Sequence, residues 1–329
     1  MRCVIYGAGA VGGTIGARLQ QHGDDVLLVA RGPHLAALRE KGLRFETPLE
    51  SRTLRIPVVG HASEIGWRPD DVVLLTTKTQ QTPAALADLR AAAGPEIALV
   101  CAQNGVENER LAARIFERVY AMLVYLPATH LEPGLVQARA APICGILDAG
   151  VYPAGVDDTI EQLTAVLDGS GLRARPTPDI LAWKYGKLLA NLGNAIQAAC
   201  DPAEDARELY GRVRAEALAC YAAAGIVPVD AEREAERRKA LSPMGTVGGR
   251  DLSGSSTWQS LARGAGSVEV DYLNGEIVLL GRLHGIPTPA NAALQRVADR
   301  MARQRAAPGS ARVAEIEAEI GRLEAHSRA

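Results

Sequence analysis

The sequence contains no apolar run that approaches the roughly 18 residues of a membrane-spanning helix, so we expect no membrane protein. Charge of one sign is not in excess either: 36 basic residues stand against 38 acidic ones, a balance that indicates neither a nucleic-acid nor a membrane surface. The N-terminus lacks the basic and cleavable apolar segments of a secretory signal. Five cysteines are scattered without a Cys-x-x-Cys pair, which argues against a zinc site or a disulfide framework and indicates a reducing cytoplasm.

A glycine motif opens the chain. A short β-branched run is followed at once by Gly7, Gly9 and Gly12 in G-x-G-x-x-G spacing. In a strand–loop–helix unit, the first glycine permits the tight turn, the second lets a pyrophosphate approach the backbone, and the third lets the helix pack on the strand. A glycine-rich turn without a ligand is the alternative. We predict that a dinucleotide cofactor binds Gly7, Ala8, Gly9, Ala10, Val11 and Gly12.

The second strand candidate ends at Arg31, where a Rossmann unit places the residue that recognises the adenosine ribose. A carboxylate there would bind the two hydroxyls of NAD, whereas an arginine pairs with the 2′-phosphate of NADP. Asp24 and Asp25 lie at the start of the strand, the wrong end for this role. The pattern favours NADP(H) as the cofactor, with a solvated loop arginine as the alternative.

Strand-like and helix-like segments alternate through the first half of the chain. Strands are predicted at 2–6, 25–30, 71–76 and 97–101, helices near 10–21, 33–41, 81–92, 107–116 and 155–169, a hairpin at 44–47 and 52–58, and a short strand at 171–175. Such alternation predicts an α/β fold with a doubly wound parallel sheet.

After Pro178 the pattern becomes almost wholly helical, and 329 residues suffice for two domains. Helices are predicted near 180–199, 203–224, 230–240, 256–262, 267–284, 289–305 and 310–325. We therefore predict a Rossmann-type domain over 1–177 and an all-helical domain over 178–329, with the chemistry in the cleft between them.

Two polar residues follow predicted strands of the first domain. Lys78 comes after the strand at 71–76, and Asn104 after the strand at 97–101. Ligands of open α/β sheets bind at the carboxyl ends of parallel strands, so both are candidate site residues. A solvated lysine and a plain turn asparagine are the alternatives.

The helix predicted at 180–199 carries Lys187, Asn191 and Asn194 at i, i+4 and i+7, which places them on one face of an otherwise apolar segment. Burial among apolar residues lowers the pKa of a lysine, so Lys187 is a candidate proton donor. A polar face without catalysis is the alternative. We expect Lys184, one turn earlier, to be solvated.

The stretch 255–274 holds two further candidates. Ser256 lies among hydroxyl residues that cap a helix start, and Glu269 precedes a stripe of apolar residues at helical spacing. Glu269 could point into a cleft; an ordinary solvated helix glutamate is the alternative.

Taken together, these motifs resemble the ketopantoate reductase family over nearly the whole chain, except for its C-terminal tail. They are GAGAVG, LVARG, LLTTKTQQT, QNGVEN, WKYGKLLAN, SSTWQSL and VEVDYLNGEIVLLGRLHGIPTP. The resemblance implies a Rossmann domain that binds NADPH, an all-helical second domain, and reduction of the 2-oxo acid 2-dehydropantoate in pantothenate biosynthesis.

The resemblance also implies roles for single residues. Lys187 matches the family's proton donor, Asn191 and Ser256 its substrate-binding residues, and Glu269 the glutamate beside the nicotinamide. Arg31 matches the arginine for the 2′-phosphate, while Lys78 and Asn104 match residues that line the cofactor and the reaction centre.

The chain departs from the family pattern around the substrate. Ala195 stands where the family usually has a second asparagine, for which Asn194 would substitute with a displaced contact. The stretch 120–137 lacks the usual glycine- and threonine-rich form, and one extra residue separates Ser256 from Glu269. A reductase of another oxo acid, an opine-like dehydrogenase, or a non-catalytic NADP(H)-binding sensor are therefore alternatives.

The tail helix predicted at 310–325 bears a narrow apolar stripe formed by Val313, Ile316, Ile320 and Leu323. Two heptads are too few for a free coiled coil, so the helix must dock on another surface. We expect a homodimer, with docking on the chain's own helical domain as the alternative.

Overall fold

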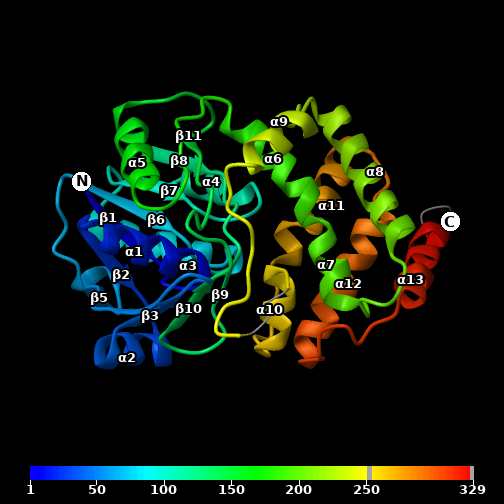
Figure 1. Cartoon of the computed structure of the whole chain (residues 1–329). Helices are drawn as coiled ribbons and strands as arrows, with labels where there is room; N and C mark the ends of the chain where they lie inside the picture. Colours follow the sequence, from blue (N-terminus) through cyan, green and yellow to red (C-terminus); the bar gives the residue numbers. More distant parts are fainter. Residues whose placement is uncertain (250–253, 327–329) are drawn as a thin grey trace. The chain divides into compact units, whose positions relative to one another are not determined.

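The computed structural model describes residues 1–249 and 254–326 (Figure 1). The chain divides into two compact units. The first comprises Met1–Lys184 and Asp230–Leu252, and the second Tyr185–Val229 and Ser253–Ala329.

The first unit is built on a seven-stranded sheet, with the strand order β11-β8-β7-β6-β1-β2-β5. Its central strand β1 (Arg2–Tyr6) pairs in parallel with β2 (Val26–Val29) on one side and β6 (Asp71–Leu75) on the other. The remaining members are β5 (Val58–Val59), β7 (Ala98–Cys101), β8 (Arg118–Met122) and the antiparallel β11 (Ala149–Val151). The predicted α/β fold is confirmed, and the strand order reverses beside β1, where open α/β sheets bind their ligands.

Helices cover both faces of this sheet. Side chains alternate along β1, so that Ile5 faces the core under α1 (Ala10–His22) and α5 (Asp158–Gly169), which lie on the near side in Figure 1. Val4 and Tyr6 face the opposite core, which is closed by α3 (Thr82–Ala93) and α4 (Glu107–Ala112). The helix α2 (Gly32–Lys41) follows β2.

A second, four-stranded sheet packs against α1. It has the order β4-β3-β10-β9 and consists of β3 (Leu43–Glu46), β4 (Ser51–Leu54), β9 (Ala128–Thr129) and β10 (Leu135–Ala138). The predicted hairpin is β3 and β4, although residues 58–59 belong to the large sheet. The strand predicted at 171–175 is wrong: Arg173 and Pro176 form only isolated bridges, to Ile146 and Ala149.

The remaining helices follow the predicted pattern closely. They are α6 (Ile180–Asn191), α7 (Gly193–Ala199), α8 (Arg207–Ala224), α9 (Ala231–Arg238), α10 (Ser256–Ala262), α11 (Asn274–His284), α12 (Pro289–Gln304) and α13 (Val313–His326). Short 3-10 turns lie at η1 (Ala62–Glu64), η2 (Thr79–Gln81) and η3 (Glu269–Tyr272). Among these described helices, none is long and apolar enough to cross a membrane.

Two predicted helices are interrupted. The helix expected at 180–199 breaks at Leu192, and the one expected at 267–284 begins as the 3-10 turn η3 before α11. Leu192 keeps helical φ and ψ of −59° and −31° and still donates to the Leu188 carbonyl, while the buried Asn274 amide donates to the Leu192 carbonyl at 3.3 Å.

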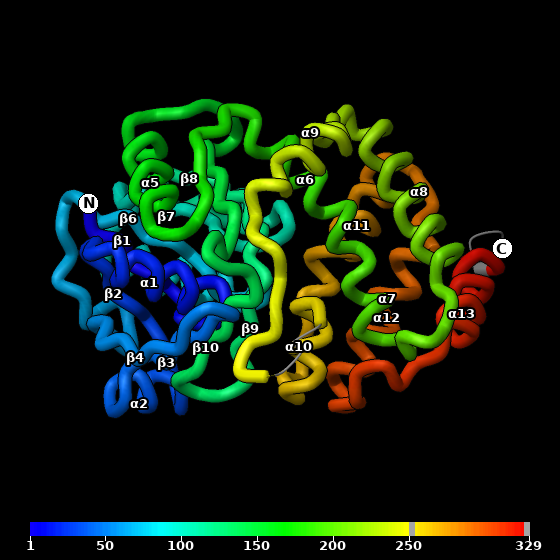
Figure 2. Tube along the Cα trace, viewed as in Figure 1, coloured from blue at the N-terminus to red at the C-terminus, as the bar shows by residue number. Residues whose placement is uncertain are grey.

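The division into units also differs from the predicted boundary between 177 and 178. The first turns of α6 remain with the first unit because Lys184 bonds to backbone carbonyls there. The chain also returns to this unit: Figure 2 shows the segment after α9 running in extended form past β9 and β10. Met244 bridges to Ala140, and Arg237 forms an ion pair with the buried Asp148 at 2.5 Å.

The stripe on α13 faces the chain's own second unit. Ile316 and Ile320 are buried, and α13 packs on α12. Arg212 of α8 forms ion pairs with Glu317 at 2.6 Å and Glu324 at 2.9 Å. The alternative reading of this helix is therefore correct, and its docking requires no second subunit.

Candidate functional site

The glycine loop has the geometry that its spacing predicts. Gly7 has a φ of +117°, a backbone conformation that residues with a side chain rarely adopt. A Cβ added to Gly12 would lie 2.2 Å from the Gly7 carbonyl oxygen, so helix and strand pack closely here. A Cβ added to Gly9 would meet no described atom within 4 Å. The loop therefore closes tightly beneath α1 and leaves space above Gly9, where a pyrophosphate would approach.

Arg31 lies at the carboxyl end of β2, as predicted, and its guanidinium contacts Tyr6 and Asp88. Its Nη2 donates to the Tyr6 hydroxyl at 2.8 Å and lies 3.4 Å from the Asp88 carboxylate. The Tyr6 hydroxyl itself donates to Asp88. Burial and the Asp88 carboxylate raise the pKa of Tyr6, so the phenol keeps its proton. The Arg31 side chain is 59% exposed, which leaves its guanidinium accessible to an anion.

A buried polar network joins the two loops that carry Lys78 and Asn104. Asn108 donates to the Thr79 hydroxyl at 3.2 Å and to the Asn104 carbonyl at 3.3 Å, and it accepts from Thr82 at 2.7 Å. The Asn104 Oδ1 atom is buried and finds no hydrogen-bond donor within the described part of the chain. The network thus brings the two predicted loops together, and Asn104 Oδ1 is among the buried amide oxygens there that find no donor within the described residues.

Lys184 contradicts its prediction, because it is only 3% exposed. Its Nζ lies 2.5 Å from the Glu109 carboxylate, and it donates to the carbonyls of Gln103 at 3.0 Å and Met122 at 3.4 Å. Burial raises the pKa of Glu109, while the ammonium opposes that rise. Lys184 and Glu109 are far apart in the sequence, and no local pattern links them. Their ion pair could therefore be found only from the folded structure.

In the second unit, the candidates lie on α6, α7, α10 and the 3-10 turn η3. Asn191 ends α6 and is buried, while Lys187, one turn earlier, is partly exposed. Asn194 lies on α7, beyond the interruption at Leu192, a residue that itself keeps helical φ and ψ of −59° and −31°. The Asn194 carbonyl accepts from the Ser255 hydroxyl at 3.2 Å, which places the start of α10 beside α7.

Ser255, rather than Ser256, caps α10 by accepting from the Trp258 N–H at 3.3 Å. Ser256 is the first residue of the helix and is partly exposed. Capping of this helix by a serine is therefore confirmed, and Ser256 directly follows the serine that bonds to the Asn194 carbonyl.

Glu269 opens η3 and is only 6% exposed, so it is not an ordinary solvated glutamate. The predicted stripe behind it is confirmed as Val270, Leu273, Ile277 and Leu280, all of them buried. Burial lowers the pKa of Arg263, and the negative charge of Glu269 opposes that change, so the two groups are electrostatic neighbours.

A second buried network escaped the sequence analysis. Asn274 donates to the Asn291 side chain at 3.1 Å, and Asn291 donates to the Glu216 carboxylate at 2.8 Å. Burial raises the pKa of Glu216, while hydrogen bonds from Ala290 and Asn291 oppose the rise. Two asparagines within apolar helical segments were the signal available in the sequence.

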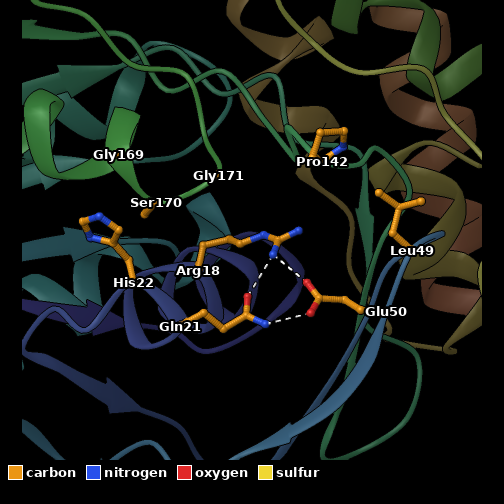
Figure 3. Close-up of a pocket in the computed structure, with 9 residues that line it drawn as sticks. All are labelled: Arg18, Gln21, His22, Leu49, Glu50, Pro142, Gly169, Ser170 and Gly171. Atoms are coloured by element: carbon orange, nitrogen blue, oxygen red, sulfur yellow. Dashed lines mark hydrogen bonds and ion pairs between the residues drawn. The ribbon is translucent and has the colours of Figure 1, made fainter.

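Figure 3 shows a pocket of about 310 Å³ near the C-terminal end of α1, away from the glycine loop. Arg18 crosses it and is satisfied by Glu50 at 2.7 Å and Gln21 at 2.9 Å. None of the predicted site residues lines this pocket, and its charged groups already pair with one another. We therefore do not assign the candidate site to it.

Two family models match this chain. The family described as ketopantoate reductase PanE/ApbA matches residues 3–145, and its C-terminal domain matches residues 179–302. A 2-dehydropantoate 2-reductase of Caulobacter vibrioides is 32% identical over 302 residues, which cover 88% of this chain and 94% of that protein.

Two solved structures extend the likeness to the fold. A PanE/ApbA family ketopantoate reductase from Ralstonia eutropha has a TM-score of 0.75 at 28% identity, over 93% of this chain and 99% of that one. A D-mandelate dehydrogenase in complex with NADH and anilino(oxo)acetate has a TM-score of 0.80 at 23% identity, over the same shares, and shows the fold alone. The chain belongs to the ketopantoate reductase family and is an oxidoreductase.

Proposed function

We propose that this member of the ketopantoate reductase family uses NADPH to reduce 2-dehydropantoate to pantoate, a step of pantothenate biosynthesis. The relatives, which are named 2-dehydropantoate 2-reductases, support the reduction of a 2-oxo acid. The observation that carries the cofactor assignment is the geometry of the glycine loop, in which Gly7 makes a tight turn at a φ of +117°, Gly12 packs against the Gly7 carbonyl, and Gly9 leaves space for a pyrophosphate. Bound NADPH would supply the hydride for the carbonyl carbon.

The residues of the first unit fit this cofactor. Gly7, Ala8, Gly9, Ala10, Val11 and Gly12 would hold the pyrophosphate at the start of α1, where backbone N–H groups point outward. Arg31 would pair with the 2′-phosphate. Lys78 would add positive charge near the cofactor, and the Asn104 amide would bind close to the reaction centre through its unsatisfied Oδ1 atom.

The residues of the second unit would act on the oxo acid. Lys187 would donate a proton from its ammonium to the oxygen of the substrate carbonyl as the hydride adds to carbon. Asn191, Asn194 and Ser256 would hold the substrate, and Glu269 would orient the reacting groups beside the nicotinamide. Lys184 does not compete for the proton transfer, because the Glu109 pair and two carbonyls engage its ammonium.

An assay of NADPH absorbance with a panel of 2-oxo acids tests the function. We expect the highest kcat/KM with 2-dehydropantoate. We also expect Lys187→Ala to lower turnover by about 10²–10⁴, the usual contribution of a general acid. Lys239→Ala, on the exposed end of α9, is the matched control and should leave turnover unchanged. A Lys187→Ala enzyme within a few-fold of the parent would remove this residue from the mechanism.

Ala195 supports a second candidate, a reductase or opine-like dehydrogenase that acts on another oxo acid. Its buried side chain offers no hydrogen bond where the family usually has an asparagine. Good turnover of 2-dehydropantoate would exclude this candidate. NADPH binding without oxidation by any acid of the panel would instead indicate a sensor.

We also place the protein in the cytoplasm. All five cysteines are buried and free, which suits a reducing compartment. The homodimer remains a hypothesis that light scattering of the full-length protein would test.

A further inference from the structure

We propose that His34 is a positioning residue that holds the glycine loop in its cofactor-binding conformation. The inference rests on the proposed NADPH binding and assigns a role to a side chain that would not touch the reacting atoms. It concerns the first unit alone, in which His34 is the third residue of α2.

His34 connects two backbone segments through its two ring nitrogens. Its Nδ1 accepts the Gly134 N–H at 2.9 Å, and its Nε2 lies 2.8 Å from the Ala8 carbonyl oxygen. Because Nδ1 is an acceptor, a neutral ring carries its proton on Nε2 and donates it to Ala8. Burial and the neighbouring His130 lower the pKa of His34 to about 4, so this neutral tautomer persists near pH 7.

The bonded carbonyl belongs to the peptide that precedes the cap of α1. Ala8 lies between Gly7 and Gly9, and Gly9 caps α1 without any side-chain hydrogen bond. The first N–H groups of a helix have no intrahelical acceptor, and these are the groups that bind a pyrophosphate. Holding the Ala8–Gly9 peptide therefore fixes the direction in which the following N–H groups point.

Two side chains secure consecutive carbonyls of this loop. The Thr76 hydroxyl donates to the Gly7 carbonyl at 2.7 Å, and the His34 Nε2–H donates to the Ala8 carbonyl. The other side of the His34 ring is anchored as well, because the Gly134 carbonyl accepts from the Arg44 N–H of β3 at 2.9 Å. His34 thus connects the glycine loop to the small sheet. Its bond to the Ala8 carbonyl orients the loop, and its bond to the Gly134 N–H orients the imidazole ring.

Two amide variants separate these bonds. In His34→Gln the terminal amide reaches the Nε2 position and can still donate to Ala8, whereas the shorter amide of His34→Asn reaches only the Nδ1 position. We expect the dissociation constant of NADPH, measured by fluorescence titration, to rise about threefold to tenfold in His34→Asn and His34→Ala. His34→Gln should stay within about twofold of the parent. His22→Asn, at the far end of α1, is the control and should leave the dissociation constant of NADPH unchanged.

Three further readouts distinguish positioning from a general structural role. The KM for NADPH should rise in His34→Asn while kcat at saturating NADPH stays unchanged. The affinity for adenosine 2′-monophosphate should also stay unchanged, because that ligand lacks the pyrophosphate. Melting temperatures identify any variant whose fold is damaged. If His34→Asn or His34→Ala is such a variant, the NADPH affinity of His34→Gln is compared with that of the remaining intact variant and of the parent.

Several results would overturn the proposal. These are unchanged NADPH affinity in both His34→Asn and His34→Ala, equal weakening in His34→Gln, or a matching loss of affinity for adenosine 2′-monophosphate. The last result would locate the effect at the 2′-phosphate instead of the loop. A parent protein that binds neither NADPH nor NADH would contradict the proposed function itself, and the role of His34 with it.

Discussion

Arg31 illustrates how a residue that is recognisable in the sequence depends on neighbours that are not. Tyr6 and Asp88 hold its guanidinium at the end of β2, and the arginine also lies over the Tyr6 ring. An arginine with fewer orientations to lose binds a phosphate at lower entropic cost. The cofactor preference is therefore a property of this small cluster as well as of Arg31.

Replacing Arg31 by alanine should weaken NADPH binding about tenfold or more, and NADH binding far less, since a charge-assisted hydrogen bond contributes about 1.5–3 kcal/mol. Fluorescence titration with both dinucleotides measures the difference. Arg39→Ala removes an exposed arginine of α2 that pairs with Glu64, and it should leave both affinities unchanged. An equal loss for the two cofactors would show that Arg31 does not recognise the 2′-phosphate.

The pair of Lys184 and Glu109 gives a stability prediction with a defined pH dependence. Lys184→Met should lower the free energy of unfolding by about 3–5 kcal/mol near pH 7, because it leaves a buried carboxylate unpaired. The folded-state pKa of Glu109 is already raised by burial, and loss of the ammonium raises it further. A carboxyl group whose pKa is higher in the folded state than in the unfolded state destabilises the fold increasingly as the pH rises above the unfolded-state pKa. The loss of unfolding free energy in Lys184→Met, relative to the parent, should therefore grow from about pH 4 upward.

Urea unfolding at several pH values tests this dependence. Replacing both partners, as in Lys184→Met with Glu109→Leu, should recover most of the lost stability, because an apolar pair needs no charge compensation. A deficit that is the same at acidic and neutral pH would be inconsistent with this account.

At the scale of elements, the junction of α6 and α7 is the feature that connects stability to the candidate site. Asn274 donates to the Leu192 carbonyl, between Asn191 and Asn194, and to the Asn291 side chain. The two bonds therefore tie this junction to the buried polar network of the second unit.

Asn274→Ala should cost about 1–3 kcal/mol of unfolding free energy, because it leaves buried acceptors without a donor. It should also raise the KM for the oxo acid, since Asn191 and Asn194 would shift relative to each other. Gln295→Ala removes an exposed amide that bonds to Asp271 and serves as the control. Unchanged stability and KM in Asn274→Ala would mean that the break forms without this bond.

At the scale of the whole molecule, α13 belongs to the second unit. Its apolar side chains Ile316 and Ile320 are buried there, and Arg296 and Arg212 pair with its acidic face. The tail thus acts as a cover for α12, and the two units each have a hydrophobic interior of their own.

Truncation after Pro308 should therefore destabilise the protein without changing its oligomeric state. Removing α13 exposes apolar surface of α12, and each kcal/mol lost from a unit of this size lowers the melting temperature by roughly 2–8 °C. Light scattering and thermal melts measure the two effects together. Conversion of a dimer to a monomer with an unchanged melting temperature would restore the intersubunit role of α13.

The sequence by itself determined the glycine loop, the position of Arg31, the alternation of strands and helices, and the apolar stripes behind Glu269 and on α13. Each depends on side-chain spacing over a few residues, which the local geometry of a strand, turn or helix converts directly into structure. The tertiary structure alone decided the rest: the Lys184 anchor, the break at Leu192, and the ring that joins Ala8 to Gly134. These bonds connect residues 81, 82 and 100 positions apart, and such groups become neighbours only after the sheets and helices have packed.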